Sequence, residues 1–207
     1  MIRFSADDKA RITAAIHSAE KSTSGEFVAV VARASNHYVF LPLLWSAIAA
    51  LLFPGACLLA GLPIRWVHLY QIQLLIFIVL TVLLLSFPKL HLMLVPRRVK
   101  HAHAGRLAKA QFYIQGVQLT PHHSGVLFFV SLAERYVEIV ADKGIHEKIG
   151  EAHWKDIIDK FVAQVRRARV ADGFVDAIGA CGAAMATHYP PDPHDVSELS
   201  DGLIEIL

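Results

Sequence analysis

The chain has 207 residues, 55% of them hydrophobic, and a net charge of +2 with histidine neutral. This length suits one ordinary domain with an additional segment. The near balance of charge argues against nucleic-acid binding, which needs a strong basic surplus on one face. The cysteines, Cys57 and Cys181, lie far apart in an apolar segment and a helical pattern, so neither a disulfide nor a redox motif is expected.

The first residues predict a helix followed by a buried strand. Ser5 is the expected N-cap of the segment SADDKARITAAIHSAEK, and Ile12, Ile16 and Ala19 recur at helical spacing. After the break at STSG, residues 26–32 read EFVAVVA, an apolar run that is typical of a strand covered on both faces. One such strand is not stable by itself, so it needs partners from later in the chain.

The apolar excess is concentrated in residues 39–60 and 67–87, which predict a transmembrane hairpin. Each segment is long enough to cross about 30 Å of hydrocarbon, and residues 34–64 contain no Asp, Glu, Lys or Arg. The short connector GLPIRW makes the two spans antiparallel. A pair of buried core helices is the alternative, but so long a charge-free run exceeds the length of a typical core helix.

Basic residues around the spans predict their orientation. The connector carries only Arg65, whereas both flanks of the hairpin are basic, so the positive-inside rule places both flanks in the cytoplasm. The N-terminus also lacks the apolar run of a signal peptide. We therefore expect a multi-pass protein of the cell inner membrane with both termini and the folded domain in the cytoplasm. The flanking cations are Lys21, Arg33, Lys89, Arg97, Arg98, Lys100, Arg106 and Lys109.

The segment after the hairpin predicts a helix, a β-hairpin and two further helices. The first helix covers residues 97–117, and its basic, histidine-rich start is expected to lie near anionic lipid headgroups. Residues 126–132 and 135–141 predict two paired strands joined by a turn longer than two residues. Residues 191–207 are rich in Pro and Asp and are expected to be loose. The expected buried positions of the first helix are Leu107, Ala110 or Gln111, Ile114 and Val117.

Residues 1–38 supply one helix and one strand, and residues 96–190 supply the elements that this strand requires. The sequence therefore predicts an α/β fold in which a small mixed β-sheet is sandwiched by helices. The transmembrane hairpin, residues 39–95, interrupts this domain, and residues 191–207 form the tail.

The stretch GVLFFVSLAERYVEIVADKGIHEKI, residues 125–149, closely resembles the signature of the TPM domain family. The segments AQFYIQGVQLTPHHSG and SGEFVAVVA fall where the family has its equivalents. The resemblance covers most of the chain outside the hairpin and implies an α/β/α sandwich on a membrane anchor.

The family includes thylakoid-lumen and photosystem-repair proteins and an auxiliary subunit of acetylcholine receptors. The resemblance implies two candidate properties, since weak acid-phosphatase activity is attributed to some plant members and some members bind calcium. Many bacterial members have no assigned activity. This chain departs from the commonest plan, in which a secreted domain precedes one C-terminal span, so the resemblance does not imply a lumenal or periplasmic setting.

Charged residues near the ends of the predicted strands are the candidate ligand-binding residues, because groups at strand ends line the usual crevice of an open α/β sheet. Glu26 and Asp142 are able to share a cation through oxygen ligands. The alternative is structural: residues 142–144 are an ordinary turn, and Glu134 with Arg135 is a surface ion pair or a structural link. The candidates are Glu26, Glu134, Arg135, Glu138 and Asp142.

No metal-binding or catalytic motif is recognisable. The twelve histidines include His101 with His103 and His122 with His123, but no HExxH or paired CxxC pattern occurs. Positions two apart on a helix do not face each other. GxxxxGK[ST], GxSxG and the common phosphatase motifs are absent as well, so no catalytic residue is assigned. No metal or cofactor is expected, with Ca²⁺ or Mg²⁺ as the remaining possibility.

Two functions remain open. The first is a non-enzymatic module, tethered to the bilayer, that binds or helps to maintain an unidentified membrane-protein partner. The second is a weak acid phosphatase that uses Glu26, Glu138 or Asp142, with or without a divalent cation.

Overall fold

The computed structural model describes residues 4–36, 38–87, 92–120, 123–191, 199 and 202–206. The chain divides into two compact units. The sandwich unit comprises Met1–Ser35 and His101–Leu207, and the hairpin unit comprises Asn36–Lys100. The sandwich unit is thus assembled from two pieces of chain that the hairpin unit separates in the sequence.

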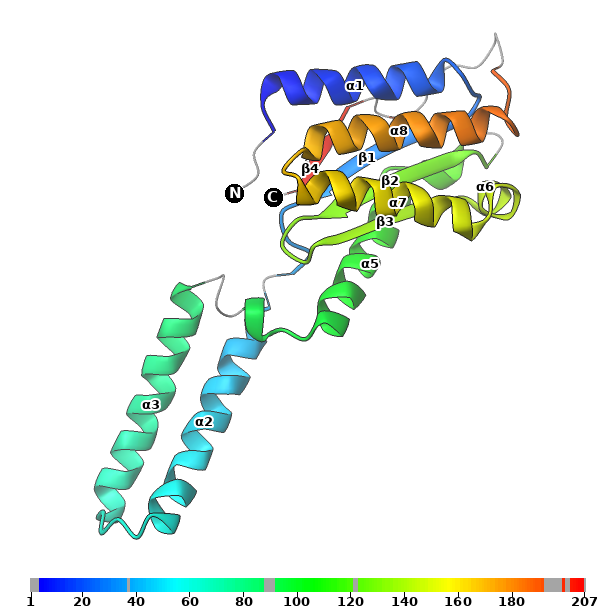
Figure 1. Ribbon diagram of the computed structural model, residues 1–207. Coiled ribbons are helices and arrows are strands. Elements are labelled where there is room, and N and C mark those ends of the chain that lie inside the picture. The colour runs from blue at the N-terminus through cyan, green and yellow to red at the C-terminus, as the bar shows by residue number, and fades with distance from the viewer. Residues whose placement is uncertain are drawn as a thin grey trace. The chain divides into compact units, whose positions relative to one another are not determined.

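A four-stranded mixed sheet forms the centre of the sandwich unit (Figure 1). The strand order is β3-β2-β1-β4, in which β1 is parallel to both β2 and β4 whereas β3 is antiparallel to β2. The pairing of β1 with β2 is complete and runs from Glu26 opposite Gly125 to Ala32 opposite Ser131. The strands are β1 (Glu26–Ala32), β2 (Gly125–Ser131), β3 (Tyr136–Ala141) and β4 (Ile204–Ile206).

Helices cover both faces of this sheet. Side chains alternate between the faces along each strand, and all seven residues of β1 are buried, so both faces are apolar there. Odd-numbered β1 residues such as Phe27 and Val31 pack against α1, α7 and α8, and even-numbered residues such as Val28 and Val30 pack against α5 and η1. The result is the α/β/α sandwich that the sequence predicts. The elements are α1 (Ala6–Glu20), α5 (Arg97–Ile114), η1 (Val117–Leu119), α6 (Lys143–Ile149), α7 (Glu151–Arg166) and α8 (Val170–Ala186).

Local interactions explain where these elements begin and how the larger core packs. Ser5 caps α1: its Oγ accepts from Asp8 N at 3.0 Å, and Ser5 N donates to Asp8 Oδ2 at 2.9 Å, which completes a capping box. In the core, the rings of Phe128, Phe161 and Phe174 contact one another edge to face at 5.0–5.3 Å between centroids. This ring cluster joins β2 to α7 and α8.

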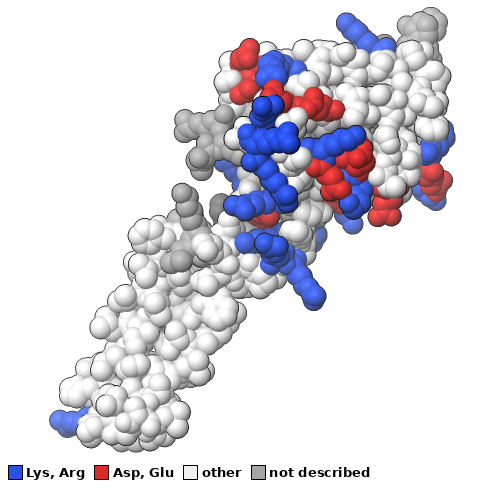
Figure 2. Space-filling model, in the orientation of Figure 1, with Lys and Arg blue, Asp and Glu red and all other residues white. Residues whose placement is uncertain are grey.

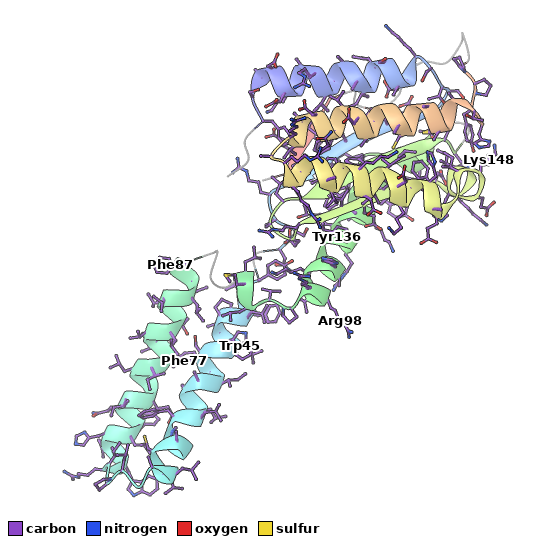
Figure 3. All side chains as sticks on the ribbon, viewed as in Figure 1. Trp45, Phe77, Phe87, Arg98, Tyr136 and Lys148 are labelled. Carbon is purple, nitrogen blue, oxygen red and sulfur yellow. The ribbon has the colours of Figure 1, made fainter. Side chains whose placement is uncertain are left out.

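The hairpin unit consists of α2 (Phe40–Leu59) and α3 (Trp66–Ser86), which lie side by side (Figure 1). Both helices are long and apolar enough to cross a membrane, by length and composition. Figure 2 shows the surface of this hairpin as almost free of charged side chains, in keeping with the single cation, Arg65, between Ala34 and Phe87. Trp45, 43% exposed, lies on the outside of α2, where Figure 3 labels it.

The structure differs from the predictions in the C-terminal tail and in α5. The tail is not wholly loose, because Ile204–Ile206 forms β4, whose hydrogen bonds occupy the free edge of β1. The buried face of α5 and η1 is partly as predicted, since Gln111 and Val117 are buried and Leu107 packs against the core. Ala104 and Ala108 are buried as well, whereas Ile114 is 69% exposed. Lys89, His122 and residues 192–198 of the predicted tail lie outside the described residues.

Candidate functional site

The five predicted site residues do not form one site. Glu26 and Asp142 lie at one edge of the sheet, with Gly125 between them: Gly125 pairs with Glu26 and accepts a hydrogen bond from Asp142 N at 3.1 Å. Glu134 and Arg135 lie at the opposite edge, in the four-residue turn between β2 and β3. Glu138 lies in the middle of β3, so the candidates occupy three separate places.

The end of the sheet at which β1 and β2 terminate contains a buried carboxylate. Glu134 is 4% exposed. Its Oε1 accepts from the backbone N–H of Ser35 at 2.9 Å, and its Oε2 accepts from Ser131 Oγ. Ser35 Oγ also donates to Ser131 Oγ at 3.0 Å. These bonds join the end of β1 to the β2–β3 turn, so the geometry supports the structural alternative for Glu134.

Arg135, the neighbour of Glu134, is exposed and has a left-handed backbone with φ of 53°. This conformation closes the turn, because Arg135 N bonds to Leu132 O at 3.4 Å. The prediction of a turn longer than two residues is therefore confirmed.

Glu26, at the amino end of β1, is 5% exposed. Its Oε2 accepts from the backbone N–H of Leu199 at 3.0 Å, across 173 positions of sequence. Glu26 therefore holds the C-terminal segment that leads into β4, a role that its position in the sequence does not reveal.

Asp142 takes part in the most accessible pairing of acid and base among the predicted positions. It caps α6, since Asp142 Oδ1 accepts from Lys143 N at 2.6 Å. Its Oδ2 lies 3.1 Å from Nδ1 of His123, whose side chain is 72% exposed. His123 was not predicted as the partner of Asp142, because only the register of the β2–β3 hairpin brings residues 19 positions apart together.

The same edge contains an aromatic side chain and a cation. Lys148, on α6, is labelled in Figure 3, and its Nζ lies 4.2 Å from the ring centroid of Tyr189. A Cβ atom on Gly144 would lie 3.1 Å from Tyr189 Oη, so the ring packs closely against the start of α6. The edge at α6 thus combines an accessible His–Asp pair with a lysine held over an aromatic ring.

Glu138 lies on the sheet face that α5 covers. Its Oε2 accepts from Tyr136 Oη at 2.9 Å, and burial, followed by the neighbouring Glu138 charge, raises the pKa of Tyr136. The Tyr136 ring also contacts His101 at 5.2 Å between centroids. At Gly105, α5 approaches β3 closely, because a Cβ atom there would lie 3.1 Å from Tyr136 Oη. Glu138 therefore belongs to the packing of α5 on the sheet.

A hollow of about 360 Å³ lies between α7 and α8. Its floor is apolar, and its rim carries Lys160, Arg167 and Asp176. Asp176 Oδ2 accepts from Gln164 Nε2 at 3.0 Å, while Lys160 Nζ pairs with Asp156 at 2.7 Å. The apolar residues of the hollow are Ile157, Phe161, Ala163, Ala177 and Ala180.

The carboxylates at these places have protein partners. Among the residues that the structure describes, no group of three or more His, Cys, Asp or Glu side chains is arranged to hold a metal ion. Glu26 accepts from a backbone N–H and Asp142 contacts His123, so each of these two acids is already engaged. The proposed shared cation between Glu26 and Asp142 stays a prediction.

Comparison with known proteins identifies the fold. The chain is similar to the BA42 protein from the psychrophilic bacterium Bizionia argentinensis, whose structure was solved by NMR, with a TM-score of 0.62 and 19% identity. The alignment covers 99% of this chain and 96% of that one. At this identity the likeness shows the fold alone, and no curated protein matches the chain. Residues 93–184, which include β2, β3, α6 and α7, match the family model described as the TPM domain.

Proposed function

We propose that this protein is a membrane-anchored TPM module that performs no reaction of its own and binds, or helps to maintain, an integral membrane protein. The observation that carries the proposal is the use of the buried strand-end carboxylates. Glu26 and Glu134 each accept a hydrogen bond from a backbone N–H group that is distant in the sequence. These bonds join separate segments of the chain, which supports a role for both side chains in the fold. Glu134 lies beyond the carboxyl end of β2, where an open sheet usually binds its ligand, and its hydrogen bonds to Ser35 and Ser131 support a role in the fold.

The chain connectivity supports a tether. The apolar hairpin is inserted between β1 and β2, which are direct neighbours in the sheet. The sandwich is consequently held at two points of the chain, after Ala32 and before α5. A tether of this kind confines a domain near the bilayer and raises its effective concentration for membrane-bound partners. We propose the inner membrane as its location, with both termini in the cytoplasm, because the flanks of the hairpin are basic whereas its connector carries only Arg65.

Site-specific photocrosslinking in native membranes tests the proposal. A photoreactive amino acid replaces Ala163, which lines the hollow between α7 and α8, or Ala14, an exposed residue of α1. We expect a discrete adduct with one integral membrane protein at one of these positions and not at the other. Equal adducts at both positions, or adducts only with abundant soluble proteins, would contradict the proposal.

The runner-up function is a weak phosphatase, and the His123–Asp142 contact is the observation that favours it. A carboxylate that orients an accessible histidine is the arrangement needed for proton transfer during phosphoester hydrolysis. The nearby Lys143 and Lys148 supply cations that are able to attract a phosphate group. This candidate site differs from the predicted Glu26, Glu138 and Asp142 set, since Asp142 is the sole shared member.

A phosphoester assay on the detergent-purified full chain separates the two functions. If the protein is a phosphatase, His123→Ala and Asp142→Asn each lower turnover at least about tenfold. The control His146→Ala changes an exposed histidine of the neighbouring α6 and leaves turnover unchanged. Absence of turnover in the unmodified protein contradicts the phosphatase function, whereas turnover that both substitutions abolish contradicts the non-enzymatic one.

A further inference from the structure

Acidic residues are missing from a long stretch of this chain. Residues 27–133 contain no Asp or Glu, although they contain eight of the Lys and Arg residues. All the acidic residues therefore lie in the first 26 residues and from Glu134 onward. The purely cationic stretch includes the apolar hairpin, α5 and η1, so the sandwich has one helical layer whose charge is only positive.

The exposed face of α5 carries three of these cations in a row that ends at Tyr113. Arg98, Arg106, Lys109 and Tyr113 are spaced by eight, three and four residues, a spacing that places them along one side of a helix. All four are exposed, and Figure 3 shows the Arg98 side chain extending away from α5. The opposite side of α5 packs on the sheet through its buried residues Ala104, Ala108, Gln111 and Phe112.

The large apolar side chains that the sandwich unit exposes gather at the end of this same layer. Among its described residues they are Tyr113, Ile114 and Leu119, with 66%, 69% and 74% of their surfaces exposed. They lie at the C-terminal end of α5 and in η1. A row of cations that leads to a small exposed apolar cluster is the composition of helices that lie in a membrane interface.

We infer that this α5–η1 face, defined by Arg98, Arg106, Lys109, Tyr113, Ile114 and Leu119, docks on the anionic phospholipids of the bilayer that holds the hairpin. The cations attract the lipid phosphates, and the three apolar side chains enter the boundary between headgroups and acyl chains. Position in the chain favours lipid as the occupant, because α5 starts ten residues after Phe87, a reach of at most about 35 Å.

Docking through this face has a consequence for the rest of the sandwich. Because α5 and the layer of α1, α7 and α8 cover opposite faces of the sheet, a docked α5 turns the other layer away from the lipid. The hollow between α7 and α8 then faces the aqueous phase, where a partner is able to reach it. The docking itself does not depend on whether the proposed partner exists.

The test uses the full chain in lipid nanodiscs. A nitroxide label is placed at Leu119→Cys, or at Glu147→Cys on the exposed surface of α6, in a background of Cys57→Ala and Cys181→Ala. The discs contain phosphatidylcholine alone or phosphatidylcholine mixed with phosphatidylglycerol. Electron paramagnetic resonance measures how often the label collides with oxygen, which concentrates in lipid, and with a nickel chelate, which stays in water. The ratio of the two collision rates shows whether the label lies in lipid or in water.

In the anionic discs we expect the label at 119 to favour oxygen and the label at 147 to favour the nickel chelate. The combined substitutions Arg98→Gln, Arg106→Gln and Lys109→Gln should lower the ratio of docked to undocked protein about fivefold for each charge removed. The matched control, Lys155→Gln, Arg166→Gln and Arg169→Gln, removes three exposed cations from α7 and the N-cap of α8 and should leave the ratio unchanged.

Three results would overturn the inference. In the first, the label at 119 favours the nickel chelate in the anionic discs. In the second, it contacts lipid equally in neutral and anionic discs, so that anionic headgroups are not the ligand. In the third, it is shielded in native membranes and exposed in every lipid-only disc, so that a protein covers this face. High salt provides an independent check, because screening should release a charge-dependent contact in the unmodified protein.

Discussion

At the scale of single residues, Glu134 shows how a buried charge closes the carboxyl end of the sheet. Glu134→Ala leaves the Ser35 N–H and the Ser131 hydroxyl without this acceptor, and we expect the free energy of unfolding to fall by about 1–3 kcal/mol. Glu134→Gln retains an amide oxygen and should lose less. Urea unfolding in detergent, followed by Trp154 fluorescence in a Trp45→Phe, Trp66→Phe background, measures both variants.

The outcome of this comparison also bears on the site. Equal stability of Glu134→Ala and the parent would show that the carboxylate is dispensable for folding, and a ligand-binding role for Glu134 would then regain support. A larger loss for Glu134→Gln than for Glu134→Ala would likewise contradict the structural role of this side chain, because the glutamine keeps an acceptor that the alanine lacks.

Cys181 gives a prediction that depends on pH. The side chain is 1% exposed, and burial raises the pKa of its thiol to about 12, against an ordinary value of 9.0. Between these values the folded protein holds the proton while the unfolded chain releases it, so this group lowers stability as pH rises above 9. We expect the free energy of unfolding of the parent, measured with urea at a series of pH values, to fall more steeply above pH 9 than that of Cys181→Ser. An equal fall for the two proteins would contradict the prediction.

At the scale of elements, α8 contains two glycines whose surroundings predict opposite effects. A Cβ atom on Gly182 would lie 2.8 Å from Ala19 Cβ on α1, whereas one on Gly179 would meet nothing within 4 Å. Gly179→Ala should therefore stabilise the protein by about 0.5–1 kcal/mol through helix propensity. Gly182→Ala should destabilise it by about 1–3 kcal/mol, because α1 must move away from α8.

Thermal unfolding of the two alanine variants and the parent measures this difference, and each variant serves as the control for the other. A gain in stability for both would mean that α1 and α8 are not in close contact at Gly182. A loss for both would mean that the exposed side of α8 is covered by something at Gly179.

Periodicity predicted some elements well because their cores consist of large apolar residues. Ile12 and Ile16 of α1 are fully buried, as their spacing indicates. The buried side of α5 was predicted only in part, because Gln111 was named but Ala104 and Ala108 were not. These two small residues let the helix approach the sheet closely but give a weak apolar signal. Hydropathy then pointed to Ile114, which the fold leaves exposed.

The candidate site was predictable only in part, for a related reason. The sequence identifies Glu26 and Glu134 as carboxylates at strand ends, but their partners are backbone N–H groups 173 and 99 positions away. Contacts of this kind depend on the register of the sheet and on β4, a strand of three residues. Neither carries a periodic pattern that a single sequence displays, and the pairing of His123 with Asp142 was hidden in the same way.

At the scale of the whole molecule, the hairpin unit interrupts a domain whose central strands come from both sides of it. β1 lies between β2 and β4, and its seven residues are all buried. A chain that begins at Pro96 has β2, β3 and every helix of the sandwich except α1, but it lacks the strand that joins β2 to β4. Apolar side chains of β2 that pack beside β1 would then be exposed to water.

We therefore expect residues 96–207, produced alone, to lack a cooperative unfolding transition and to exchange the backbone amides of β2 rapidly. Residues 1–36, added as a separate chain, should restore slow exchange because they supply both α1 and β1. The matched control is the same peptide with Val30→Asp, which places a charge at a fully buried position of β1 and should not restore it. Slow exchange in residues 96–207 alone would contradict the prediction, because the two pieces of chain would then not depend on each other to fold. Restoration by the Val30→Asp peptide would contradict it in another way, by showing that β1 does not occupy the centre of the sheet.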